Sequence, residues 1–136
     1  MDVLESKGAL GSFRLSEGVV STIVATSATE VAGVAGMAVF GVTLKNVLAK
    51  DQAQRSTKIK MNEGAVGIDL CVDMLMGANL KEVAEAVQKN VKSAVENMTG
   101  LVVSRINVVI AGIKAEKASA QEVVENTKKT DEEKGN

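Results

Sequence analysis

The chain has 136 residues, of which 46% are hydrophobic and 24% are charged. That length fits one globular domain, and that composition excludes disorder of the whole chain. Histidine, tryptophan, tyrosine and proline are absent, and Cys71 is the only cysteine. The chain therefore lacks the usual groups of imidazole catalysis, zinc binding and intrachain disulfides. We expect no enzyme activity, no cofactor, no metal site and no small-molecule substrate.

The net charge of −1, from 16 basic and 17 acidic residues, argues against a globally basic nucleic-acid-binding protein. The first ten residues carry acids where a secretory signal would place Lys or Arg. Residues 18–44 hold one charge, Glu30, but the uncharged part after it is punctuated by glycines and falls short of the roughly 20 residues that span a membrane. The sequence thus predicts a cytoplasmic protein without a transmembrane segment.

Residues 11–15 predict a short strand, and the segment after them predicts a helix. Ser16 is the expected N-cap, and Glu17 lies in the first turn. An apolar stripe at helical spacing follows, and Gly33 is the natural stop. The stripe consists of Val20, Ile23, Val24, Ser27, Ala28 and Val31. Residues 42–50 fit either a short second helix or a strand.

Residues 57–61 and 65–75 alternate with period two around a turn, which predicts a β-hairpin. With Glu63 and Gly64 as the two turn residues, the apolar positions of both strands share one face. That face carries Ile59, Met61, Val66, Ile68, Leu70, Val72 and Met74. The opposite face carries Lys58, Lys60, Asp69, Cys71 and Asp73.

Residues 79–99 give the strongest periodic signal. Asn79 is the expected N-cap, an apolar stripe runs along the helix, and Gly100 ends it. Residues 101–113 predict a long strand, with Ile106, Val108 and Ile110 on one side and Arg105, Asn107, Val109 and Ala111 on the other. From Lys114 onward the composition shifts to charged and small residues, so we expect residues 114–136 to form a tail that is partly helical or mobile.

The element order β-α-(α)-β-β-α-β predicts an α+β, two-layer fold for a single domain over residues 1–113. Its mixed sheet has three to four strands, with two long helices on one face. A similar order occurs in KH domains, where a GxxG loop joins two helices and clamps nucleic acid. Gly33 and Gly36 provide a GxxG, but Val34 and Ala35 between them supply no cation. A KH-like RNA-binding module is therefore the less favoured alternative.

Polar residues on the predicted hairpin offer little catalytic chemistry. Asp69 and Asp73 lie four residues apart on one strand face, a separation of about 13 Å. That spacing is wide for a catalytic carboxylate pair. Cys71 between them has acidic neighbours and no histidine that would generate a thiolate. We expect solvated carboxylates and an unreactive thiol.

Two surfaces are candidates for contacts with partners. The first is a basic segment between residues 45 and 60, which contains five cations and one acid, Asp51. Such a segment could bind an acidic partner, anionic lipid headgroups or RNA. The alternative is a loop whose charges are only solvated. The cations of this segment are Lys45, Lys50, Arg55, Lys58 and Lys60. The sheet face opposite the helices would also expose an apolar strip on the last strand. That strip consists of Val103, Val109 and Ala111, and we expect it to mediate self-association into a homo-oligomer.

Two segments of the chain resemble a known family. LSEGVVSTIVATSATEVAGVAGM (15–37) and residues 66–113 are similar to the bacterial alkaline shock protein family of envelope stress response proteins, with EVAGVAGM and VQKNVKSAVENMTGL as the most specific parts. The resemblance implies a small, non-enzymatic, cytoplasmic protein of mainly Gram-positive bacteria. It also implies self-association and, for some members, attachment to the inner face of the membrane through a membrane-anchored partner. The chain departs from the family in having MGANLKEVA (76–84) where Tyr and Pro are common.

Overall fold

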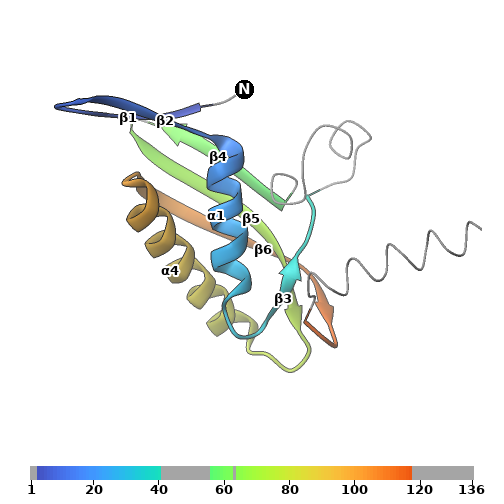
Figure 1. Cartoon of the computed structure of the whole chain (residues 1–136). Coiled ribbons are helices and arrows are strands. Elements are labelled where there is room, and N and C mark those ends of the chain that lie inside the picture. The colour runs from blue at the N-terminus through green and yellow to red at the C-terminus, as the bar shows by residue number, and fades with distance from the viewer. Residues whose placement is uncertain (1–2, 41–55, 63, 118–136) are drawn as a thin grey trace, which may run out of the picture.

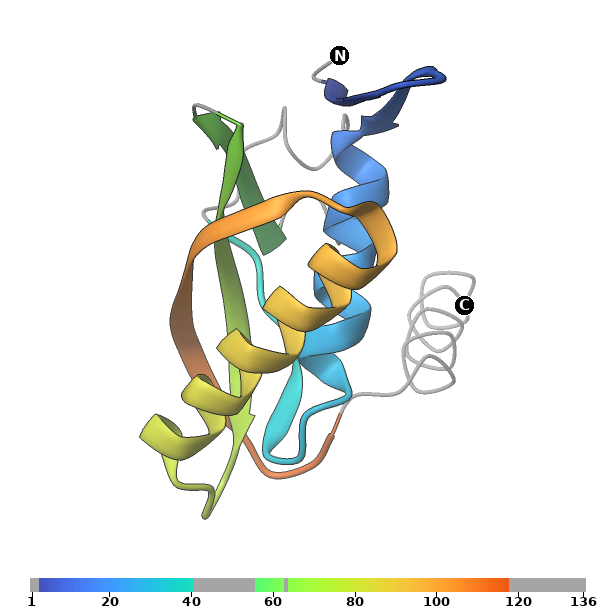
Figure 2. The ribbon, with the colours of Figure 1, turned by 90° about the vertical axis from the view of Figure 1, so that its left-hand side faces the viewer.

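The computed structural model describes residues 3–40, 56–62 and 64–117 (Figure 1). Two of its strands form a hairpin that is a sheet of its own, and the other four form a mixed sheet. Both helices cover one face of the four-stranded sheet (Figure 2). The predicted α+β, two-layer fold is confirmed. The elements are β1 (Val3–Gly8), β2 (Gly11–Ser16), α1 (Glu17–Thr29), β3 (Val34–Met37), β4 (Thr57–Asn62), β5 (Ala65–Leu75), α4 (Leu80–Thr99) and β6 (Val102–Lys114).

Both helices begin after the predicted N-caps, and α4 ends at the predicted Gly100, whereas α1 ends at Thr29, before the predicted stop at Gly33. The Ser16 hydroxyl accepts a hydrogen bond from the Val19 amide, and the Asn79 side chain accepts one from the Glu82 amide. Gly100, with a φ of 73°, ends α4 in the left-handed conformation that glycine adopts without strain. Local sequence therefore sets the start of both helices and the end of α4, but Val31, which was expected in the stripe of the first helix, lies beyond the end of α1.

β5 is the central strand, and β6 pairs with it in parallel along its whole length. β3 and β4 share the other edge of β5, both antiparallel to it. Met37 faces Val72 and Thr57 faces Leu70, so Cys71 is the one position of β5 between the two pairings. The Ala38 amide donates to the Cys71 carbonyl at 2.9 Å. β3 and β4 therefore lie end to end along the same edge of β5, and residues 39–56 connect them in the sequence.

The predicted hairpin register is confirmed. Asn62 pairs with Ala65, which makes Glu63 and Gly64 the two turn residues, and Ile59 lies opposite Ile68. The apolar positions of β5 consequently face the helices, where side chains from α1 and α4 complete a continuous core. Its fully buried members include Val20, Val24, Ala28, Val66, Ile68, Leu70, Val72, Met74, Val87, Val91 and Val95.

Polar side chains join α1 both to the sheet and to α4. The Thr57 hydroxyl of β4 donates to the buried Ser21 hydroxyl of α1 at 2.8 Å. The Asn90 side-chain amide of α4 donates to the Ser27 carbonyl of α1 at 2.6 Å. Buried polar groups that are paired in this way avoid the cost of lost hydration and fix how the helices sit on the sheet.

Two parts of the predicted element order need correction. β1 was not expected, and it extends the predicted strand at residues 11–15 into a hairpin. β3 was not expected either, and it contains Gly36. Gly33 and Gly36 therefore do not form a loop between two helices, and the motif behind the KH-like alternative is lost. The expectations for residues 42–50, and for the tail beyond residue 117, lie outside the described residues.

Candidate functional site: the uncovered face of the sheet

The sheet face opposite the helices carries the polar side chains of the three longest strands of the sheet in ordered rows. Strand register brings Lys60 of β4, Gly67 of β5 and Arg105 of β6 into one row. Lys60 and Arg105 are exposed. A side-chain carbon added at Gly67 would lie 3.2 Å from the Arg105 Nε, so the Arg105 side chain passes over Gly67. This row is the cationic end of the face.

The next row is mixed in charge. It contains Lys58, Asp69 and Asn107. The Asn107 side-chain amide donates to Asp69 Oδ1 at 2.7 Å, and the Lys58 ammonium lies 4.6 Å from the centre of the Phe40 ring. A cation over an aromatic face is attracted by the ring quadrupole, so Phe40 fixes Lys58 beside the cationic row.

Beyond this row the face becomes apolar and then acidic. Cys71 is only 3% exposed although it lies on this face; it pairs with Val109, which is 45% exposed, and Asp73 pairs with Gly112. Burial, and secondarily the negative charge of Asp73, raise the pKa of the Cys71 thiol above its ordinary value. The raised pKa favours the protonated form of the thiol at neutral pH. The face runs from two cations at one end to one carboxylate at the other.

Part of the predicted self-association strip lies on the other side of the sheet. Val103 is only 5% exposed and pairs with Val66, in the core. The reason is a bulge: Val66 faces Val103, whereas Gly67 faces Arg105, so Ser104 is an extra residue that reverses the side-chain alternation. Val109 and Ala111 remain exposed, and the strip is therefore shorter than predicted.

β6 is an edge strand with limited cover. The Glu96 carboxylate of α4 accepts from the Val103 amide at 3.0 Å, and the Gln88 amide donates to the Ile106 carbonyl at 2.9 Å. Past Ile106, no strand among the described residues pairs with the outer edge of β6. Unpaired strand edges are templates for pairing with another chain.

The structure splits the predicted basic segment. Lys58 and Lys60 belong to β4 and are exposed on the uncovered face. Lys45, Lys50 and Arg55 lie outside the described residues. Arg105 joins the two lysines on this face, where the alternation of residues 101–113 predicts it, and the parallel register of β5 and β6 puts it in the row of Lys60. Alternation alone does not give this shared row, which depends on how the strands pair.

The described residues hold no group of three histidine, cysteine or carboxylate side chains arranged to bind a metal ion. Among the helices of the described segments, none combines the length and apolar character that crossing a bilayer requires.

The fold and this face define a class of protein: a small α+β domain with helices on one sheet face and, on the other, exposed charged side chains that no helix of the described residues covers. Residues 5–115 match the alkaline shock protein 23 family, which is described as having a cell envelope-related function. The chain belongs to this family, as its sequence resemblance predicts.

Three bacterial relatives are similar over most of their length. The chain is 32% identical over 107 residues to the uncharacterized protein Spy1614 of Streptococcus pyogenes, covering 76% of this chain and 88% of the relative. It is 30% identical to the uncharacterized protein YqhY of Bacillus subtilis, with 84% of each chain covered. The uncharacterized protein YloU of Bacillus subtilis is 25% identical, with 82% of this chain and 95% of the relative covered. No solved structure matches the chain.

Proposed function

We propose that this chain is a non-enzymatic scaffold protein of the cell-envelope stress response that acts in the cytoplasm. It binds an acidic segment of a membrane-anchored or other envelope-related partner, and it self-associates. The observation that carries the proposal is the cationic end of the uncovered face, where Lys60 and Arg105 lie in one row and Lys58 lies in the next. The cell envelope-related function of the family supports the same role.

The charges of this end suit an acidic protein segment. Two exposed cations from different strands, without a carboxylate in their own row, attract negative charge over about 8 Å at physiological ionic strength. The guanidinium of Arg105 also presents a planar fork of donors that matches a carboxylate. The absence of histidine from the whole sequence, and the raised pKa of the Cys71 thiol, favour a binding role over catalysis.

A charge-reversal experiment tests this role. The double variant Lys60→Glu/Arg105→Glu should lose proteins that the unchanged chain captures from native membranes. The matched double variant Lys89→Glu/Lys92→Glu, on exposed positions of α4, should retain them. Both variants should keep the circular dichroism of the unchanged protein, because all four side chains are exposed.

RNase treatment separates this function from the RNA-binding alternative. Captured proteins should remain after RNase if the contact is with protein. If they disappear, or if the Lys60→Glu/Arg105→Glu variant captures the same proteins as the unchanged chain, the proposed function is wrong.

A further inference from the structure

The β1–β2 hairpin is part of neither the four-stranded sheet nor its uncovered face. It pairs residues 3–8 with residues 11–16 and forms no strand pairing with the four-stranded sheet. It projects beyond the end of the sheet, from the start of α1 (Figure 1). An isolated two-stranded hairpin is only marginally stable in water. The core anchors it through Leu15, which packs on the buried cluster next to α1.

The tip of the hairpin is unusual in being apolar. Leu10 is fully exposed and Phe13 is 50% exposed. Gly8 and Gly11 flank the turn and pair with each other, so little side-chain material surrounds Leu10. An exposed large apolar side chain at a loop tip gains free energy only when something apolar covers it.

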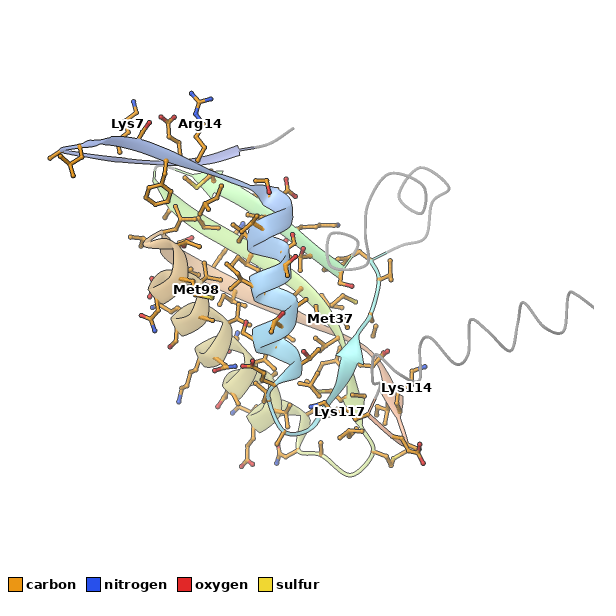
Figure 3. All side chains as sticks on the ribbon, viewed as in Figure 1. Lys7, Arg14, Met37, Met98, Lys114 and Lys117 are labelled. Atoms are coloured by element: carbon orange, nitrogen blue, oxygen red, sulfur yellow. The ribbon has the colours of Figure 1, made fainter. Side chains whose placement is uncertain are left out.

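The cations around the tip indicate what covers it. Residues 7–14 (KGALGSFR) contain Lys7 and Arg14 and no acid, while Glu5 lies across the hairpin from Arg14. The Lys7 and Arg14 side chains both point away from the body of the protein (Figure 3). Phe13 pairs with Ser6 and so lies on the opposite face of the hairpin. An apolar tip bordered by cations is complementary to an anionic bilayer, with its apolar interior and negative surface.

We propose that the β1–β2 hairpin is a lipid-binding element whose tip inserts into the surface of an anionic membrane. Strand rise places Arg14 about 13 Å behind Leu10. Interfacial protein segments enter the headgroup and acyl boundary by about 5–10 Å. Leu10 therefore reaches the acyl chains, Phe13 lies at the boundary, and Lys7 and Arg14 contact the headgroups. A second copy of the chain is a poorer occupant, because two such tips bring cations of like sign together.

A single tryptophan reports this insertion directly, because the chain contains none. The Leu10→Trp variant should show a blue-shifted emission with phosphatidylglycerol vesicles, quenched by brominated acyl chains, and no shift with phosphatidylcholine vesicles. The Met76→Trp variant is the matched control. Met76 is 73% exposed and belongs to the turn between β5 and α4, and Figure 1 shows that turn at the other end of the molecule from the hairpin, so its emission should not shift.

Variants of the unlabelled protein test the same contacts by co-sedimentation with phosphatidylglycerol vesicles. Leu10→Asp should lower the partition coefficient about tenfold or more. Lys7→Gln and Arg14→Gln should each lower it about fivefold at low salt. The Lys60→Gln/Arg105→Gln variant should bind vesicles unchanged, which separates this proposal from partner binding by the uncovered face.

Three results would overturn the proposal. The first is equal emission shifts at positions 10 and 76. The second is vesicle binding that survives Leu10→Asp in a variant with unchanged circular dichroism. The third is a dimer that dissociates on the Leu10→Asp substitution without vesicles, which would make a second copy the occupant of the tip.

Discussion

Lys60 and Arg105 lie on either side of Gly67, in one row across the bare face of the sheet. The two cations belong to strands that flank β5 from opposite edges, one antiparallel and one parallel. The missing side chain at Gly67 leaves the space that the Arg105 side chain crosses. Glycine usually weakens a strand, but at position 67 it leaves room for the long side chain of Arg105.

Substituting Gly67 by alanine should therefore change the stability of the domain very little. In the Gly67→Ala variant the nearest neighbour is the flexible Arg105 side chain, at 3.2 Å from the new carbon. That side chain can move, so the free energy of unfolding in urea should change by less than about 0.5 kcal/mol.

Gly33→Ala is the contrasting variant. Gly33 has a φ of +99°, and its new carbon would lie 2.6 Å from Cγ2 of Val83. Backbone strain and a clash with a packed valine add, so the free energy of unfolding should fall by about 2 kcal/mol or more. Equal losses in the Gly67→Ala and Gly33→Ala variants would contradict this account of both glycines.

The helices and the β4–β5 hairpin could be predicted because their signals are local. The Ser16 and Asn79 caps, the apolar stripe of α4 and the two-residue turn all lie within short stretches of sequence. β3 could not be found in this way. It has four residues, and what makes it a strand is pairing with Val72–Met74, far along the chain.

The candidate site could be predicted only as far as its residues follow from patterns within single strands. The alternation of each strand predicts that Lys58, Lys60 and Arg105 lie on this face, whereas the row that Lys60 and Arg105 share depends on the register of β5 with its two neighbours. Val103 was assigned to the wrong face because strict alternation was assumed through Ser104. A bulge adds one residue to a strand, and no particular amino acid marks its position in the sequence. Strict alternation therefore assigns the residues on one side of the bulge to the wrong face of the sheet.

Truncating the buried stripe of α4 should destabilise the domain. Val87 and Val91 are both 0% exposed. Val87→Ala or Val91→Ala removes methyl groups from a packed core, and we expect the free energy of unfolding to fall by roughly 1–3 kcal/mol. Met98→Ala on the same helix, at a side chain 71% exposed, is the control and should change it by less than about 0.5 kcal/mol. Unchanged denaturation midpoints in both valine variants would contradict the packing described.

The Cys71 thiol should make stability depend on alkaline pH. Burial, and then the charge of Asp73, raise its pKa in the folded protein. The unfolded chain loses this proton near the usual cysteine pKa of about 8.5, while the folded chain keeps it. Its contribution to stability is complete below that pKa and is lost as the pH rises through the higher, folded value. In Cys71→Ala this part of the alkaline decline should be absent from urea titrations.

The same burial predicts slow chemistry at the thiol. Iodoacetamide at pH 8 should modify Cys71 far more slowly in the native protein than in urea, because the thiolate is the reactive form. Rapid modification of the native protein would show that the thiol is accessible.

The last expectation concerns the outer edge of β6. Beyond Ile106 this edge has no partner strand within the described part of the chain, and Val109 and Ala111 are exposed beside it. α4 covers the edge only near its start, through Glu96 and Gln88. If a second copy of the chain pairs along this edge with twofold symmetry, both copies contribute the same β6 residues to the contact.

If the protein self-associates through this edge, Val109→Lys should convert the oligomer into a monomer in sedimentation velocity, because two buried ammonium groups would face each other across a symmetric contact. Val109 is already 45% exposed, so the circular dichroism of the variant should not change. Val102→Lys is the matched control, since Val102 is 59% exposed at the other end of the same strand, and it should leave the oligomer intact. Deleting residues 117–136 should also leave it intact. If the unchanged protein sediments as a monomer and the deletion causes aggregation, the tail covers this edge and self-association through β6 is wrong.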